Sequence, residues 1–202
     1  MRLVEKHSGP MPTGTDEPSI DVSPIETMTD GLQGYIQIYT GDGKGKTTAA
    51  LGLALRAAGA GMRVALIQFL KSGDYSEIQA LRRLDPPVDI AQFGTGRFVR
   101  GRPGAEDRAM AAKGLQAARK ALNGAAHDLV ILDEINVVGA LGLVDPQEVL
   151  AMLAERPSHV EVVLTGRNAP SIWCAAADLI TVMQAEKHYY TQGVAARTGI
   201  EK

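Results

Sequence analysis

Six short apolar segments recur along the chain, each about as long as a β-strand. They lie at residues 35–39, 64–70, 88–93, 129–132, 160–164 and 179–183. Several of them are apolar at every position instead of every second one, which is typical of strands buried on both faces of a parallel sheet. The pattern therefore predicts a central, mostly parallel sheet of about six strands.

Segments with helical spacing of apolar residues fill the intervals, at residues 47–58, 75–84, 106–122, 146–155 and 170–177. Gly59 is expected to end the first helix. Asp145 is expected to cap the fourth, with Pro146 in its first turn, and Pro170 is expected in the first turn of the fifth. This alternation predicts a doubly wound α/β domain with helices on both faces of the sheet. Ligands bind such sheets beyond the carboxyl ends of the strands.

The first 33 residues differ in composition from the rest. They hold four prolines, at positions 10, 12, 18 and 24, among many Ser, Thr, Asp and Glu residues. This composition predicts an extended or mobile N-terminal arm over residues 1–33, followed by one folded domain over residues 34–202. The alternative is an arm that docks on a partner subunit.

Charge and cysteine content narrow the class of protein. The net charge is −2, whereas general binders of nucleic acid or anionic membranes usually carry a basic excess. The single cysteine, Cys174, fits a reducing compartment. The chain has no apolar leader and no apolar run near the roughly 18 residues of a membrane span. We therefore expect a cytoplasmic protein without nucleic-acid or membrane partners.

The stretch GDGKGKTT, residues 41–48, lies between the first predicted strand and the first predicted helix. Glycines at Gly41, Gly43 and Gly45 allow backbone N–H groups to converge on an anion, and the dipole of the following helix favours negative charge at the same place. The stretch therefore predicts a phosphate-binding loop and, with the predicted sheet, a P-loop (RecA-like) domain.

The polar side chains of this loop suit a nucleotide. Lys46 can place a positive charge on the phosphates, Thr47 can offer its hydroxyl to Mg²⁺, and Thr48 can bond a phosphate oxygen. Asp42 and Lys44 complete the loop. The usual spacing G-x-x-x-x-G-K-[ST] would need glycine at position 40, where this chain has Thr40. The loop is therefore one residue short.

Two later segments are predicted to complete the site. HDLVILDEIN, residues 127–136, ends a strand in Asp133 and Glu134. An Asp at that strand end in P-loop proteins binds Mg²⁺ directly or through water, and Glu134 is a second metal ligand or a base. LTGRNAP, residues 164–170, places Arg167 just beyond another strand, where it can hold triphosphate oxygens.

Together these motifs resemble the ATP:corrinoid adenosyltransferases of the CobA/BtuR type. The resemblance covers residues 34–202 and includes the short loop, LVILDEIN, LTGRNAP and the C-terminal stretch ADLITVMQAEKHYYTQGVAARTGIEK. It implies the cob(I)yrinic acid a,c-diamide type of reaction, in adenosylcobalamin biosynthesis or salvage. A Co(I) corrinoid attacks the 5′ carbon of ATP, a Co–C bond forms, and triphosphate leaves. It further implies Mg²⁺, ATP bound in reversed orientation, a homodimer and an electron-donating flavoprotein.

The resemblance also adds candidate residues outside the loop. Arg56 on the first helix and Lys71 after the second strand match cations of the family pattern. In the family, a Phe and a Trp after a Thr-Gly displace the lower ligand of the corrinoid. This chain has Arg97 and Phe98 after Thr95-Gly96 and no Trp there. We expect Phe98 to serve as the wedge, Arg97 to meet the corrinoid periphery, and Trp173 to be a packing residue.

Two rival functions fit the same residues. The first is a P-loop NTPase or kinase in which Glu134 activates water or a hydroxyl against the γ-phosphate. The second is a non-catalytic protein that binds nucleotide or corrinoid. Intact triphosphate as a product distinguishes the adenosyltransferase from both.

Overall fold

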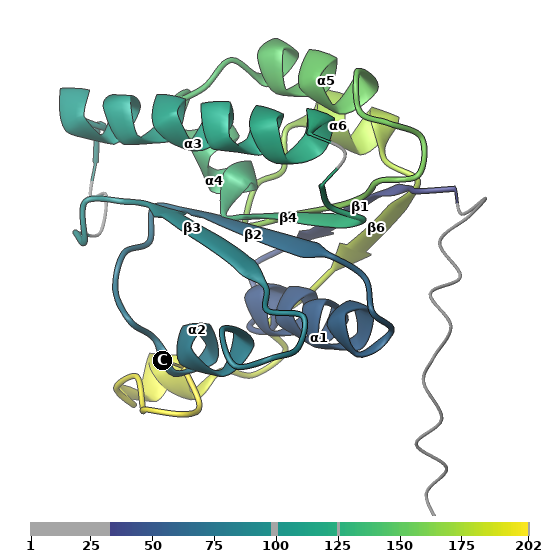
Figure 1. The fold of residues 1–202 in the computed structure, drawn as a ribbon. Helices are drawn as coiled ribbons and strands as arrows, with labels where there is room; N and C mark the ends of the chain where they lie inside the picture. Colours follow the sequence, from purple (N-terminus) through teal and green to yellow (C-terminus); the bar gives the residue numbers. More distant parts are fainter. Residues whose placement is uncertain (1–32, 98–100, 125, 202) are drawn as a thin grey trace, which may run out of the picture.

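The described residues form one six-stranded sheet in the order β3-β2-β4-β5-β1-β6 (Figure 1). The computed structural model describes residues 33–97, 101–124 and 126–201. The strands are β1 (Ile36–Thr40), β2 (Val64–Phe69), β3 (Asp89–Phe93), β4 (Leu129–Asp133), β5 (Glu161–Thr165) and β6 (Leu179–Val182). Every pairing among them is parallel. The predicted α/β fold class is confirmed.

Helices cover both faces of this sheet (Figure 1). On one face lie α1 (Lys46–Gly59) and α2 (Ser76–Leu81), and on the other lie α3 (Ala105–Asn123), α4 (Ile135–Ala140), α5 (Pro146–Ala154) and α6 (Ser171–Ala176). A short 3₁₀ helix, η1 (Tyr189–Gln192), lies near the C-terminus. Helix α4 was not predicted, because six mostly apolar residues with a glycine show no helical periodicity.

The predicted helix cap is found at one helix, and the observed helix ends differ from the predicted ones at two others. The Asp145 side chain accepts a hydrogen bond from the backbone N–H of Gln147 and Pro146 is the first residue of α5, as predicted. Pro170 precedes α6 as its cap instead of lying in its first turn. Gly59 is the last residue of α1, and the left-handed glycine that reverses the chain is Gly61, with φ of 78°.

Two apolar layers hold the sheet between its helices. The side chains of one layer come from α1, α2 and the strand residues that face them, including Leu66 and Ile131. The other layer joins the opposite strand face to α3, α4, α5 and α6. Trp173 lies fully buried in that second layer and its indole N–H donates to the carbonyl of Pro146 at 2.8 Å, so the prediction of a packing role is confirmed. No helix among the described residues is long and apolar enough to cross a bilayer.

An ion pair fixes the amino edge of the sheet, away from the strand ends that carry the predicted site. The Asp128 carboxylate, just before β4, accepts hydrogen bonds from the backbone N–H of Arg63 at 2.8 Å and from its guanidinium at 2.9 and 3.2 Å. Arg63 lies just before β2. These hydrogen bonds hold the pKa of Asp128 below its ordinary value, against an opposing effect of burial.

We expect Asp128→Asn to lower the free energy of unfolding by about 1–3 kcal/mol at pH 7, because charge-assisted hydrogen bonds are lost. Since the folded-state pKa is depressed, the stabilisation is complete above the ordinary Asp pKa of about 3.9 and is lost as the pH falls through the folded-state value. Urea denaturation of both proteins between about pH 7 and pH 3 should show a constant difference above about pH 5 that narrows at lower pH, as the carboxylate of the unfolded chain becomes protonated. A difference that persists unchanged to pH 3 would contradict this.

Candidate functional site

The predicted phosphate loop joins β1 to α1 and rests against the chain that follows β6. Gly41 has φ of 94°, and a Cβ there would lie 2.4 Å from the carbonyl oxygen of Met183. The backbone N–H of Gly43 donates to that same oxygen at 2.7 Å. Glycine is therefore required by conformation and by the closeness of the backbone. Gly45 caps α1 without a side chain, which leaves the first N–H groups of the helix available to an anion.

Lys46 folds back over this loop. Its ammonium donates to the carbonyl oxygens of Gly41 at 2.7 Å and Gly43 at 2.6 Å. An ammonium has three N–H donors, so one is left for a ligand. Burial lowers the pKa of Lys46, as does the nearby charge of Arg167, although Glu134 and Asp42 oppose this. Lys44 and Thr48 lie exposed beside it, so the loop presents positive charge and hydroxyls to a ligand.

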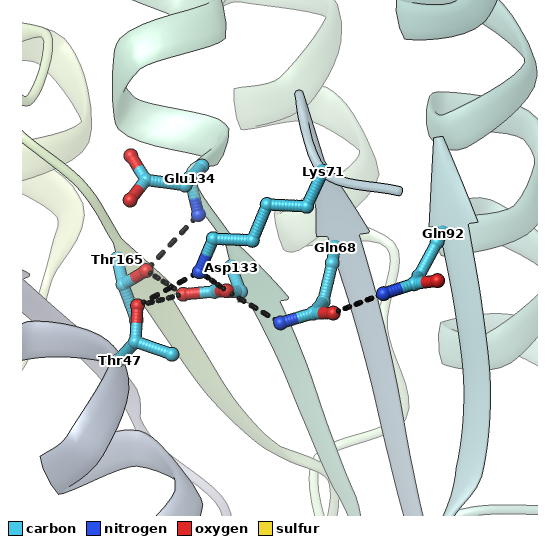
Figure 2. Close-up of polar contacts among 7 residues, drawn as sticks. All are labelled: Thr47, Gln68, Lys71, Gln92, Asp133, Glu134 and Thr165. Atoms are coloured by element: carbon cyan, nitrogen blue, oxygen red, sulfur yellow. Dashed lines mark hydrogen bonds and ion pairs between the residues drawn. The ribbon is translucent and has the colours of Figure 1, made fainter. Parts of the chain in front are cut away.

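Asp133, at the end of β4, is completely buried and accepts four hydrogen bonds (Figure 2). Thr47 and Thr165 donate to Oδ1 at 2.8 and 2.6 Å. Gln68 and Lys71 donate to Oδ2 at 3.0 and 2.7 Å. Burial by itself would raise the pKa of Asp133. The charge of Lys71 and the hydrogen bonds from Lys71, Thr165 and Thr47 instead hold this pKa below its ordinary value. Asp133 is therefore a carboxylate whose acceptor capacity is filled by protein groups.

Two glutamines extend this network across the sheet. Gln92 of β3 donates to Oε1 of Gln68 at 2.9 Å, and Gln68 of β2 donates to Asp133 of β4. Figure 2 shows the three side chains in a row at the ends of adjacent strands. Sequence reasoning missed both glutamines and Thr165. The available signal was a polar residue inside each of the apolar runs VALIQF and DIAQF, because a buried polar group needs a partner.

Glu134 differs from Asp133 in backbone conformation, in hydrogen bonding and in the direction of its pKa shift. It has φ of 65°, a left-handed conformation that is uncommon for a residue other than glycine. Its N–H donates to Thr165, and its carboxylate points away from the Asp133 network (Figure 2). Among the described residues, none donates a hydrogen bond to that carboxylate. Burial raises the pKa of Glu134, and the negative charge of Asp133 raises it further.

The arginine loop after β5 meets the phosphate loop. Arg167 donates to the carbonyl oxygen of Asp42 at 3.1 Å, and its Nε lies 3.7 Å from the Asp42 carboxylate. Buried Asn136 of α4 bridges from beneath, since its amide donates to the carbonyls of Gly166 at 3.1 Å and Tyr39 at 3.4 Å. The structure thus brings Arg167, the loop, Asp133 and Glu134 to one edge of the sheet, as the sequence predicts.

Two other predicted residues do not join this cluster. Arg56 lies exposed in the last turn of α1, at the end of the helix away from the phosphate loop. There it lines a pocket together with Gln37 and Glu161. Arg97 lies exposed after β3 and faces Glu106 of α3 at 3.7 Å. Phe98, the predicted wedge, falls outside the described residues.

The C-terminal stretch closes on itself beyond β6. His188 caps η1 by accepting the backbone N–H of Tyr190, as a structural histidine does. Glu201 accepts hydrogen bonds from Tyr189 and from the Arg197 guanidinium. These contacts hold the pKa of Glu201 at about 2. The side chain of Tyr190 is exposed.

The chain is similar to known proteins over most of its length. The family described as ATP:corrinoid adenosyltransferase BtuR/CobO/CobP matches residues 32–201. The chain belongs to this family. The corrinoid adenosyltransferase of Sinorhizobium sp. is 36% identical over 181 residues, covering 88% of this chain and 84% of that protein. The corrinoid adenosyltransferase of Pseudomonas aeruginosa is 34% identical over 170 residues, covering 84% of each chain.

A longer relative is also similar. An uncharacterized protein of Nostoc sp. is 38% identical over 184 residues, which are 84% of this chain and 48% of that protein. The chain therefore spans about half the length of that relative. Membership of the adenosyltransferase family agrees with the resemblance of the short loop and of the two strand-end motifs.

The residues of this adenosyltransferase-family site suit a magnesium ion. Mg²⁺ prefers oxygen ligands and is usually held by one or two side chains together with phosphates and waters. Thr47 offers a hydroxyl and Glu134 a carboxylate without a hydrogen-bond donor among the described residues. Asp133 is filled by its four donors, so it fits better as a partner that orients Thr47 than as a direct ligand.

We expect Gln68→Leu to lower the free energy of unfolding by about 1–3 kcal/mol, because Asp133 loses a donor and the amide of Gln92 loses its acceptor. Urea denaturation measures the loss. Gln116→Leu, at an exposed position of α3, is the matched control and should change stability by no more than about 0.5 kcal/mol. Equal stability of the two variants would show that the glutamine row is not part of the folding energetics.

Proposed function

We propose that this protein transfers the 5′-deoxyadenosyl group of ATP to a Co(I) corrinoid and releases triphosphate. The observation that carries the proposal is the meeting of the short loop, Lys46 and Arg167 at one edge of the sheet. Family membership supports it. The Co(I) centre brings its own electron pair, so a Co–C bond forms while the bond from the 5′ carbon to oxygen breaks. The electron pair of that bond leaves with the triphosphate.

The protein's contribution in this proposal is position and charge. Loop N–H groups and the uncapped start of α1 hold the triphosphate, and Lys46 and Arg167 stabilise the negative charge that grows on it as it leaves. Thr47 and Glu134 would hold Mg²⁺, which supplies further charge neutralisation when bound. Such fixed groups stabilise the transition state without a protein nucleophile, and holding ATP near the corrinoid supplies the remaining advantage.

The partners in this proposal follow from the family resemblance. We infer a homodimer and a flavoprotein electron donor. The exposed edge strand β6, with Leu179, Ile180 and Val182 open to solvent, supports contact with a second copy, because an open sheet edge is a surface for pairing or covering.

One observation favours a second candidate function. Glu134 has a raised pKa and an unengaged carboxylate beside the loop, as a base that activates water against a γ-phosphate would.

An anaerobic assay with MgATP and chemically reduced cobalamin separates the adenosyltransferase from the NTPase. Loss of Co(I) with one triphosphate per light-sensitive alkylcobalamin supports adenosyl transfer. Release of ADP and phosphate without corrinoid change supports the NTPase, and no change in either supports a binding protein.

We expect Lys46→Ala to reduce adenosyl transfer by at least about a hundredfold, because the charge that faces the leaving triphosphate is lost. The same anaerobic assay measures it. Lys113→Ala, at an exposed position of α3, is the control and should retain the activity of the parent protein. Unchanged activity of Lys46→Ala would exclude the loop as the triphosphate site.

We expect Phe98→Ala to slow the reaction that starts from Co(II) corrinoid more than the reaction that starts from chemically produced Co(I). The reason is that a wedge which displaces the lower ligand assists only the reduction. Parallel assays from the two cobalt states measure the ratio. An equal loss in both would assign Phe98 to binding instead.

A further inference from the structure

Lys71 lies between Thr47 of α1, a candidate Mg²⁺ ligand, and Asp133 of β4, which orients Thr47. Its ammonium donates to Oδ2 of Asp133 at 2.7 Å and to Oγ1 of Thr47 at 3.2 Å (Figure 2). The Thr47 hydroxyl already donates its own hydrogen to Oδ1 of Asp133. One of the two lone pairs of the Thr47 hydroxyl is therefore engaged by Lys71, which places an ammonium against the oxygen that would bind a cation.

The hydrogen bonds to Asp133 leave no free acceptor position on its carboxylate. A carboxylate has about four lone-pair positions, and all four are used. Gln68 and Thr165 are completely buried strand residues, and Thr47 is held in the first turn of α1. Lys71 follows β2 on a flexible stem and its side chain is 24% exposed. Of the four donors, Lys71 is the one that can withdraw without disturbing a strand or helix.

We propose that Lys71 is a tethered cation that occupies the metal position beside Thr47, so that Mg²⁺ enters only together with the triphosphate of ATP. The proposal rests on the proposed use of MgATP. Without nucleotide, a divalent cation at Thr47 would meet an ammonium bound to the same oxygen, and like charges repel strongly at such distances. A triphosphate on the loop gives the ammonium a new anionic partner, and its withdrawal frees Thr47.

This arrangement would prevent unproductive metal binding. Free Mg²⁺ at the empty loop would occupy Thr47 and Glu134 without the phosphates that complete its ligand set. With Lys71 in place, the buried Asp133 is neutralised before ATP arrives, and the metal and nucleotide bind as one unit. The residue thus couples two binding events through a single exchange of partners.

The test is a titration of the full chain with Mn²⁺ alone, followed by the electron paramagnetic resonance signal of free Mn²⁺. We expect the parent protein to bind Mn²⁺ weakly without nucleotide and Lys71→Met to bind it at least tenfold more tightly. Lys71→Arg keeps the charge and should behave as the parent. Lys44→Met removes one positive charge from the neighbouring phosphate loop, where no described contact links it to Asp133, and should also leave the affinity for Mn²⁺ alone unchanged.

Two results would overturn the proposal. One is equal Mn²⁺ affinity of Lys71→Met and the parent, and the other is an equal gain in Lys44→Met, which would assign the effect to net charge. If Lys71→Met does not fold, Lys71→Gln takes its place, because its amide can still donate to Asp133. A rise of melting temperature with Mg²⁺ alone, in the variant and not in the parent, is the second readout. The titration uses neither corrinoid nor turnover, so absence of adenosyl transfer leaves its outcome interpretable.

Discussion

The buried charge of Asp133 is the constraint on which the rest of the site depends. A carboxylate removed from water is stable only when it is paired and hydrogen-bonded. Its donors come from α1, β2, the loop after β2 and β5. Satisfying one carboxylate therefore fixes α1, β2 with the residues that follow it, and β5 relative to β4, although these segments lie far apart in sequence. The start of α1, which follows the glycine loop, is held in this way through Thr47.

The distribution of charge around this point explains why the loop suits a polyanion. Lys71 is matched by Asp133, and the two together are close to neutral. Lys46, Arg167 and the uncapped start of α1 then remain as the positive groups facing the loop, with Asp42 as a partial counter-charge at its exposed rim. The loop can attract phosphate because the charge of Asp133 is already matched by Lys71 and does not offset these positive groups.

The fold can be predicted from the sequence because the buried strands have a distinctive pattern of apolar residues. Buried parallel strands are apolar throughout, so β2 and β4 are visible as continuous runs, and glycine-rich and acidic motifs follow β1 and β4 directly. Residues that belong to one strand but act on another are harder to predict. Gln68, Gln92 and Thr165 form a row only after the order β3-β2-β4-β5 is known. Arg56 lies in the last turn of α1, at the end of the helix away from the phosphate loop, and its part in ligand binding stays a prediction.

The two adjacent carboxylates show how one strand end serves two purposes. Asp133 continues the direction of β4 into the interior, where four donors hold its pKa low and its position fixed. The left-handed conformation of Glu134 turns the next side chain out of that network, into a half-buried place where its pKa is raised. Backbone strain of this kind persists only where the surroundings enforce it, and here the hydrogen bond from the Glu134 N–H to Thr165 does so. Since Thr165 also donates to Asp133, the group that fixes the structural carboxylate is the same group that holds the second one free for a ligand.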